Sequence, residues 1–417
     1  MGSACQPAGA DCSRGSVKIT FLLSQSLESP SGLGRYWPVA KELRRLGHRV
    51  TILALHHDWR GLTQRRFVRD GVEVRYVGQM HVRKVGDTKL YFERLDLLTV
   101  VIRATLGLLW EALRVSTDVY HVGKPHPMNG VAGLVASRLR RKPLYLDCDD
   151  YEAASNRFDS EWQRRFVAFF EDHLPRHAEG VTANTKFTVR RLLSQLGCRS
   201  DRVFYVPNGV DRERFSAPDP VRISELSREL AIGNSLVVLY VGSLSLTSHS
   251  VDLLVDAFPY VLASCSRAVL VLVGGGEDIP VLKRRASELG ISQSVRFIGR
   301  VAPDQVTAYY NLAHVVVDPV ADDQVAEARS PLKVVESLAC GTPVVTGDVG
   351  DRRAMLSNGE LGSITAPGAA TELSKGIVRL LCDASERARA SAAALESRDA
   401  WYWDRLVWAF AKVYRHY

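Results

Sequence analysis

The stretch from Ala326 to Val345 carries polar and charged residues at a spacing suited to an anionic ligand. Ser330 is a favourable N-cap residue, and Pro331 suits the first helical position because its missing N–H would have no helical partner. Apolar residues then recur at helical spacing, and a Gly-Thr-Pro sequence ends the predicted helix. The free amides and the positive dipole end at the helix start would favour a bound phosphate.

Two charged side chains extend this prediction from a phosphate to a nucleotide. Lys333 adds a mobile positive charge beside the helix start. Glu336 follows further along the helix, where a carboxylate could accept hydrogen bonds from a ribose diol, as an acidic residue does in dinucleotide-binding folds. The alternative is an ordinary capped helix with a solvated lysine and glutamate, and the helix terminus alone does not separate the two.

A family resemblance supports the nucleotide site. Residues 330–345, Ser-Pro-Leu-Lys-Val-Val-Glu-Ser-Leu-Ala-Cys-Gly-Thr-Pro-Val-Val, resemble the nucleotide-sugar motif of retaining glycosyltransferases of family 4, which have the GT-B fold. The resemblance implies that Glu336 holds the donor ribose and that amides near Leu332 and Lys333 hold the diphosphate. The family pattern places another glutamate eight positions earlier to contact the donor sugar. Ala328 occupies that position here, with Glu327 beside it.

The elements around this helix follow a repeated strand–helix pattern. A strand is predicted at 17–23, a helix at 35–46 and a second strand at 49–55, with a Gly-Leu-Gly turn at 32–34 before the helix. This turn lacks the full dinucleotide fingerprint, so a nicotinamide site is not expected. The turn resembles the opening of family 4 enzymes, in which such glycines let the backbone approach the donor phosphates and the acceptor.

Further candidates stand at the predicted carboxyl ends of strands, where sites form in α/β folds. Lys124 and His126 follow the predicted strand 118–122, and Asp149 and Asp150 end the next strand. Because successive strand residues point to opposite sides, we expect only one of the two aspartates to face the cleft. The expected catalytic residues are Lys333, His126, Asp149 and Lys124.

A second run of strands begins at Leu236 and has the same organisation. In family 4 an arginine follows the position of Gly242, and a lysine comes a few residues later, where the pair neutralises the departing diphosphate. Here Ser243 stands at the first position. We expect Lys333 to take over part of this role, because a developing negative charge must be stabilised. Together with the resemblance, these arguments predict donor contacts from Gly32, Gly242, Ser243, Gly274, Arg300, Val301, Glu327, Arg329, Ser330, Pro331, Leu332, Lys333 and Glu336.

The fold prediction is α/β with GT-B architecture, in which two Rossmann-like doubly wound domains face a central cleft. The expected parts are a disordered tail at 1–16, an acceptor domain at 17–212, a nucleotide-sugar domain at 213–398 and a helix at 399–417. The resemblance implies that this last helix crosses back onto the first domain. Docking on its own domain is the alternative.

Composition narrows the class of partner. The 417 residues carry a formal net charge of +8, which suits nucleotide sugars or an anionic membrane surface. No basic run or familiar motif indicates nucleic acid. The seven cysteines are scattered, which is typical of reduced thiols in a cytoplasmic protein. The apolar window 97–113 contains Arg103 and Glu111, which favours a buried amphipathic helix over a membrane span.

Residues 78–95 are basic and aromatic. They are interpreted as an acceptor-facing or lipid-facing loop, with a plain solvated loop as the alternative. Peripheral contact with the inner membrane face is therefore a further expectation for this cytoplasmic protein.

The resulting hypothesis is retaining transfer of a sugar from a nucleotide-sugar donor to a hydroxyl of a sugar or lipid-linked glycan, in glycan or glycoconjugate biosynthesis. No metal-ligand cluster is recognised in the sequence, and no cofactor other than the donor is expected. The substitutions Ala328 and Ser243 favour one alternative, a catalytically impaired GT-B protein that acts as a binding or scaffold partner of an active transferase. A nucleotide-sugar epimerase is a third alternative, but no acid–base set of that kind is recognised.

Overall fold

A computed structural model describes residues 15–85, 88–156, 158, 160–215, 218–247 and 249–414. The disordered tail expected at 1–16 lies outside these ranges except for its last two residues.

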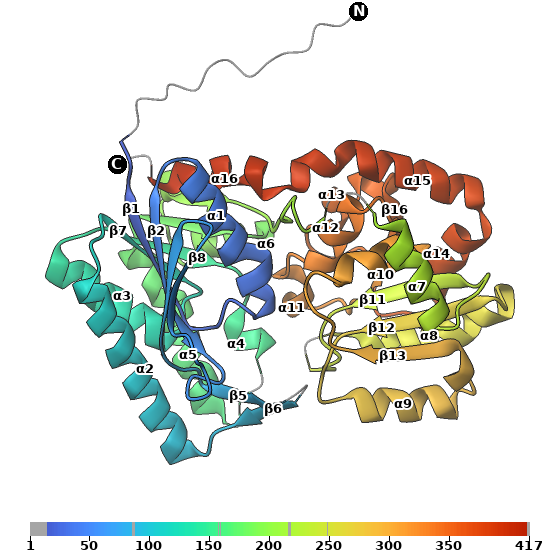
Figure 1. Cartoon of the computed structure of the whole chain (residues 1–417), viewed down its shortest axis with the longest axis horizontal. Coiled ribbons are helices and arrows are strands. Elements are labelled where there is room, and N and C mark those ends of the chain that lie inside the picture. The colour runs from blue at the N-terminus through green and yellow to red at the C-terminus, as the bar shows by residue number, and fades with distance from the viewer. Residues whose placement is uncertain are drawn as a thin grey trace, which may run out of the picture.

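The first domain is built on an eight-stranded sheet in the order β10-β9-β8-β7-β1-β2-β4-β3, on the left in Figure 1. All neighbouring pairs are parallel except β3 with β4. The strands are β1 (Lys18–Leu23), β2 (Arg49–His56), β3 (Arg66–Arg69), β4 (Val72–Gln79), β7 (Val119–Gly123), β8 (Leu144–Cys148), β9 (Gly180–Ala183) and β10 (Val203–Tyr205). The helices are the π-helix η1 (Gly32–Tyr36), α1 (Trp37–Arg45), α2 (Arg94–Arg114), α3 (Pro127–Arg140), α4 (Glu152–Ser155), α5 (Glu161–His173) and α6 (Lys186–Arg190).

The second domain is built on a parallel six-stranded sheet in the order β13-β12-β11-β14-β15-β16. Its strands are β11 (Leu236–Val241), β12 (Ala268–Val273), β13 (Val295–Gly299), β14 (Val315–Asp318), β15 (Val344–Gly347) and β16 (Gly362–Thr365). The remaining helices are α7 (Pro220–Glu229), α8 (Val251–Ser264), α9 (Ile279–Glu288), α10 (Val306–Leu312), α11 (Gln324–Glu327), α12 (Leu332–Ala339), α13 (Arg352–Met355), α14 (Ala370–Cys382), α15 (Ala384–Ser397) and α16 (Trp403–Ala411).

Both sheets bury apolar side chains on their two faces. In β1, Phe21 belongs to the buried cluster on one face of the sheet and Leu22 to the cluster on the other face. In β11, Val237 and Val238 likewise belong to two different buried clusters. Strands that are covered by helices on both faces need continuous apolar runs, which is what these segments have. The predicted fold class, with two doubly wound Rossmann-like domains, is confirmed.

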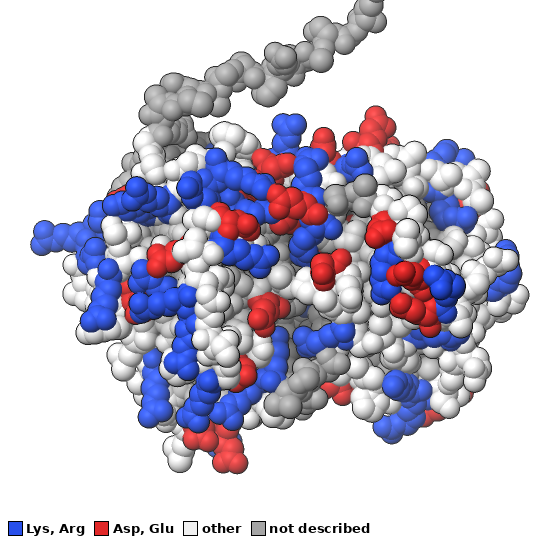
Figure 2. Space-filling model, in the orientation of Figure 1, with Lys and Arg blue, Asp and Glu red and all other residues white. Residues whose placement is uncertain are grey.

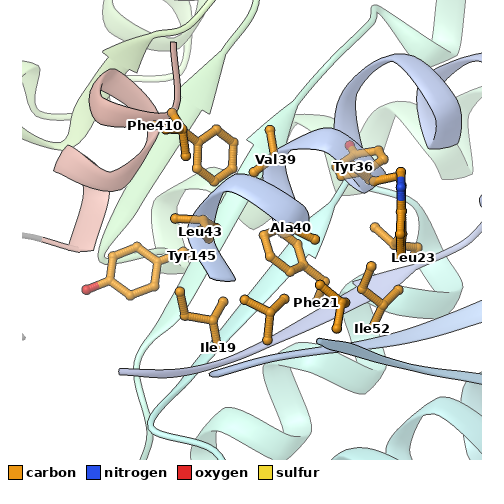
Figure 3. Close-up of a cluster of buried hydrophobic side chains, with 14 of the residues drawn as sticks. Ile19, Phe21, Leu23, Tyr36, Val39, Ala40, Leu43, Ile52, Tyr145 and Phe410 are labelled. Carbon is orange, nitrogen blue, oxygen red and sulfur yellow. The ribbon is translucent and has the colours of Figure 1, made fainter. Parts of the chain in front are cut away.

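The C-terminal segment spans both domains. Figure 1 shows α15 over the second domain and α16 beside α1 of the first. In Figure 3, Phe410 of α16 lies beside Val39 of α1, above Phe21 of β1. The indole Nε1 of Trp403 donates a hydrogen bond to the carbonyl of Gly34 at 2.8 Å. The last helix therefore completes the core of the first domain.

Two sequence interpretations need correction. Residues 78–95, expected to form a loop, include an antiparallel hairpin of β5 (Val82–Val85) and β6 (Thr88–Tyr91). Helix α2, expected to be a buried amphipathic helix, is fully buried only at Ala104, Leu108, Glu111 and Ala112, and Val101, Leu109 and Leu113 pack on the same core while partly exposed. Large apolar residues on its other side stay exposed. No helix of the described chain is both long and apolar enough to span a bilayer.

Candidate active site

The start of α12 differs from the prediction by one residue. Pro331 has a non-helical ψ of 114° and takes the N-cap position, so Ser330 is not the N-cap. Instead the Ser330 hydroxyl accepts a hydrogen bond from the backbone N–H of Asn208 at 3.2 Å. The Asn208 side chain donates to the Ser330 carbonyl at 2.9 Å. Ser330 therefore ties the helix start to the connection between the domains.

The Gly-Leu-Gly segment at 32–34, predicted as a turn, forms the first part of η1 and lies against this helix start. A Cβ atom on Gly34 would come within 2.5 Å of the Leu332 side chain, so glycine permits this close approach. Gly32 is packed against its own loop, where a Cβ would lie 2.5 Å from the carbonyl oxygen of Ser26. Its expected contact with the donor stays a prediction. Leu332 thus meets the first domain, and its neighbour Lys333 points into the second.

Lys333 is not the mobile charge that the sequence predicted. Its side chain is buried, and Nζ lies 3.0 Å from Oδ1 of Asp318 at the end of β14. Arg352, at the start of α13, contacts the other oxygen of Asp318 through Nε at 2.7 Å. Burial alone would raise the pKa of Asp318, but the two cations hold it well below its usual value. Burial lowers the pKa of Lys333, although Asp318 opposes this shift.

This buried cluster lies at the carboxyl ends of the second sheet and carries two cations for one carboxylate. Arg329, half-buried nearby, adds to the positive potential at Lys333. The Nη2 atom of Arg352 is buried and has no hydrogen-bond partner in the described structure. Sequence reasoning missed Arg352 and Asp318. Their positions after strands β15 and β14 are the signal that could have found them.

Gly242 and Gly274 bring two strand ends together beside this cluster. Gly274 has a φ of 137°, and a Cβ there would lie 1.8 Å from the carbonyl oxygen of Gly242. The Tyr240 hydroxyl donates to the carbonyl of Ser243 at 2.8 Å, which fixes the turn. A Cβ on Gly242 would lie 3.4 Å from Cε of Lys333. The glycines therefore shape a turn that borders the lysine.

The other expected donor residues are more dispersed. Glu336 is half-buried on α12, where its Oε2 accepts a hydrogen bond from the Tyr310 hydroxyl at 2.8 Å. Burial raises the pKa of Glu336, and the charge of Arg214 opposes the rise. Glu327 faces Arg190 of the first domain, with 3.9 Å between charged atoms. Arg300 and Val301 follow β13 at the edge of the sheet, two strands from β11.

In the first domain, Lys124, His126 and Asp149 lie close to Asp150 and to Glu152, which sequence reasoning had not assigned. Nζ of Lys124 lies 2.8 Å from Asp150, 2.7 Å from Glu152 and 3.7 Å from Asp149. Nε2 of His126 lies 2.9 Å from the other oxygen of Glu152. We call these five residues the acceptor-side cluster. Lys333, the fourth expected catalytic residue, belongs to the other domain.

The prediction that Asp149 and Asp150 point to opposite sides is wrong. Strand β8 ends at Cys148, so strand alternation does not govern the two residues beyond it. Both carboxylates approach Lys124. Burial raises the pKa of Asp149 to about 6, although Lys124 opposes the shift.

Arg35 is another residue that sequence reasoning missed. Its guanidinium is fully buried and bonds both oxygens of Asp147, at 2.7 and 2.6 Å. Its third nitrogen donates to the Val206 carbonyl and the Asn208 side chain, each at 3.1 Å. An aspartate inside the apolar strand 144–148 was the available signal, because a buried carboxylate needs a cation. Arg35, Asn208 and Ser330 thus form a polar chain from the first core to α12.

Glu171 makes the stability of the first domain dependent on pH. Its buried carboxylate accepts the backbone N–H groups of Glu152 and Ala153, and burial raises its pKa to about 7 from 4.5. The fold therefore favours the protonated acid. The stability contributed by this preference is complete below about pH 4.5 and is lost as the pH rises through 7, at a cost of about 3 kcal/mol.

Glu171→Gln should therefore stabilise the protein more at pH 7.5 than at pH 4.5. The gain in free energy of unfolding over wild type should be about 3 kcal/mol larger at the higher pH. Urea unfolding at both pH values measures this difference. The exposed Glu396→Gln variant is the control and should show little change. A Glu171→Gln effect that is the same at both pH values would contradict the prediction.

The fold also brings together three residues of types that bind metal ions, which their spacing in the sequence did not indicate. Ligand atoms of Glu28, His56 and His57 lie within 4.8 Å of one another. However, Nδ1 of His56 accepts the backbone N–H of Asp58 at 3.0 Å, so Nε2 carries the proton of the neutral ring. Nε2 faces Glu28 at 3.6 Å, and His56 in this tautomer fits a carboxylate partner better than a cation.

Comparisons with known proteins agree with this architecture. Residues 31–209 match the model of the glycosyl transferase 4-like domain, and residues 235–383 match that of glycosyl transferases group 1. The chain is 29% identical over 238 residues to the GDP-mannose-dependent alpha-(1-6)-phosphatidylinositol monomannoside mannosyltransferase of Mycobacterium tuberculosis. That alignment covers 56% of this chain and 61% of the mycobacterial protein.

Other similarities extend over nearly the whole chain. The D-inositol 3-phosphate glycosyltransferase of Acidothermus cellulolyticus is 28% identical, with 98% of this chain and 92% of that protein covered. Among solved structures, Anabaena HepE in complex with UDP and glucose has a TM-score of 0.72 at 20% identity, with 96% of this chain and 100% of that chain covered. The family matches confirm the resemblance seen in the sequence, and the chain belongs to the group 1 glycosyltransferases of family 4, which have the GT-B fold.

Proposed function

We propose that the protein transfers a glycosyl group from a nucleotide sugar to an acceptor hydroxyl, with retention at the anomeric carbon and without a catalytic metal ion. The observation that carries this proposal is the cationic cluster of Lys333, Asp318 and Arg352 beside the turn at Gly242 and the start of α12. Free amides at a helix start and neighbouring cations favour a diphosphate. The donor is then the only cosubstrate, and no further cofactor takes part.

The charge of the cluster suits a departing diphosphate. As the bond between the anomeric carbon and the phosphate oxygen breaks, negative charge grows on that oxygen. The acceptor oxygen bonds to the same face of the sugar, and its proton passes to the leaving phosphate. Lys333 and Arg352 supply two positive charges, of which Asp318 balances one. The net charge that remains replaces the arginine and lysine that family 4 enzymes carry after the position of Gly242.

We assign acceptor binding to the first domain. Buried carboxylates such as Asp149 and Glu152 accept hydrogen bonds from sugar or polyol hydroxyls. Lys124 is already paired with three carboxylates and His126 with one of them, so the cluster suits an uncharged hydroxyl-bearing group better than an anion. The two named relatives act on a phosphatidylinositol mannoside and on an inositol phosphate. A polyol or glycan, free or lipid-linked, fits this chemistry, in the biosynthesis of a glycan or glycoconjugate.

A donor panel tests the function. Thermal unfolding is measured with the UDP, GDP, ADP and dTDP forms, because a nucleotide at 100 times its Kd stabilises the fold by about 2.7 kcal/mol. The stabilising donor is then assayed for hydrolysis and transfer, with and without EDTA, and the product anomer is determined by NMR. We expect turnover that EDTA leaves unchanged. Binding without turnover would favour the scaffold function, and no stabilisation by any nucleotide would overturn the donor site.

Glu336 is expected to bind the donor ribose. Glu336→Ala should weaken nucleotide binding by about 1.5–3 kcal/mol, the range for hydrogen bonds to a charged group. Isothermal titration with the nucleotide found in the panel measures this loss. Because Tyr310 donates to the same carboxylate, Tyr310→Phe is the matched control and should retain most of the affinity. Equal affinities of wild type and a folded Glu336→Ala variant would remove the assignment.

A further inference from the structure

Helix α2 exposes a continuous apolar stripe. Leu95, Leu98, Ile102, Leu106 and Trp110 are all exposed, Leu95 by 81% and Trp110 by 57%. Their spacing of three and four residues places them on one side of the helix, which we call the α2 stripe. The opposite side of α2 packs on the first domain. Contiguous apolar surface of this kind marks an interaction site, whereas single exposed apolar residues are ordinary.

A second helix of the first domain also exposes large apolar residues. Helix α2 packs against α3, and α3 packs against α5. The exposed side of α5 adds three large aromatic residues, Trp162, Phe166 and Phe169. Figure 1 shows α2 along the outer edge of the first domain, away from the second domain. The stripe therefore stays accessible while the two domains face each other.

The charges around the α2 stripe are mainly positive. Arg94, Arg103 and Arg114 are exposed on α2 itself, against the exposed acids Asp96 and, at the N-cap, Glu93. The guanidinium of Arg114 lies 3.9 Å over the Trp110 ring. Helix α3 contains no acidic residue and ends in the basic sequence Arg-Leu-Arg-Arg at 138–141, beside the end of α2. On the face shown in Figure 2, Lys and Arg also outnumber Asp and Glu over the first domain.

The exposed apolar residues and the positive charges beside them together indicate the kind of partner. Leucine and tryptophan on one side of a helix, bordered by arginines, fit the boundary between headgroups and acyl chains of an anionic bilayer. A second copy of this chain fits less well, because a two-fold interface would place the arginines of the stripe near one another.

The surface is also connected to the acceptor-side cluster. Helix α2 follows the β5–β6 hairpin directly, and His81 just before the hairpin stacks on His126 with ring centroids 6.0 Å apart. We propose that the α2 stripe and its arginines bind an anionic bilayer peripherally and so hold the acceptor-side cluster close to lipid headgroups. This docking does not depend on catalysis.

Vesicle flotation tests the proposal with the full chain. Vesicles of phosphatidylcholine alone are compared with vesicles that also contain phosphatidylglycerol. Wild type should float with the anionic vesicles only, and binding should weaken as salt rises. The triple variant Ile102→Ser, Leu106→Ser, Trp110→Ser should lose at least about tenfold in the partition coefficient, given the apolar area removed. The matched control is Trp408→Ser on α16, whose indole is 53% exposed, and it should bind like wild type.

Three results would overturn the proposal. They are absence of wild-type binding to anionic vesicles, a triple variant that binds equally well, and a wild-type dimer in light scattering that the triple variant dissociates. Arg103→Glu provides an independent variant and should weaken binding without removing apolar surface. Circular dichroism and thermal unfolding establish that each variant is folded. Donor hydrolysis in the absence of vesicles should be unchanged in these variants, so failure of docking and failure of glycosyl transfer are distinguishable.

Discussion

Replacing Arg35 with Met should lower the free energy of unfolding by about 3–5 kcal/mol, because the change leaves Asp147 as an unpaired buried carboxylate. The variant also loses the hydrogen bonds to the Val206 carbonyl and Asn208. The guanidinium further lies 5.6 Å from the ring of Trp403 in the C-terminal helix, so that contact disappears as well. Urea unfolding followed by tryptophan fluorescence measures the loss.

Arg45→Met is the matched control at the other end of α1. Arg45 forms ion pairs with Glu42 and Glu213, but half of its side chain is exposed to solvent. Exposed pairs contribute about 0–1 kcal/mol, so Arg45→Met should change stability little. The double variant Arg35→Met with Asp147→Leu should recover much of the loss, because no unpaired charge remains buried. A loss below about 1 kcal/mol for Arg35→Met would show that Asp147 is not a buried anion.

Lys333→Ala should lower kcat/KM by about 100- to 1,000-fold with the native donor, comparable to the loss of one group that stabilises charge in a transition state. The ammonium lies beside Gly242 and close to the helix start, where the diphosphate is proposed to bind. Arg352 stays paired with Asp318 in the variant, so the buried carboxylate keeps a cation. Steady-state kinetics with the donor identified in the panel measures the effect.

The control for this prediction is Lys375→Ala, which removes an exposed lysine paired with Glu372. It should stay within about twofold of wild type, as surface substitutions usually do. Nucleotide affinity and thermal stability of Lys333→Ala separate a catalytic loss from a folding defect. If folded Lys333→Ala also stays within twofold of wild type, Lys333 is only a structural partner of Asp318.

The fold class and the place of the donor helix could be predicted from the amino-acid sequence alone. Continuous apolar runs such as 18–23 and 236–241 predicted parallel strands covered on both faces, and the two sheets contain them. The Ser-Pro pair followed by periodic apolar residues predicted α12 to within one residue. These features were accessible because they depend on neighbours in sequence: strand alternation, helical period and the chemistry of helix ends.

The pairing of charged side chains, in contrast, became visible only in the folded chain. Lys333 looked solvated because its partners Asp318 and Arg352 belong to other strand ends and meet it only when β14 and β15 lie side by side. Arg35 meets Asp147 across 112 residues of sequence.

The exposed side of α2 was equally beyond sequence reasoning. Periodicity shows that a helix has apolar sides, but the neighbouring elements determine which side is covered. Here Ala104 and Leu108 are buried and Leu106 and Trp110 are exposed. The burial and ion pairing of a side chain depend on residues far away in the sequence. The pattern of one segment therefore predicts whether it forms a helix or a strand, but not which residues it will contact.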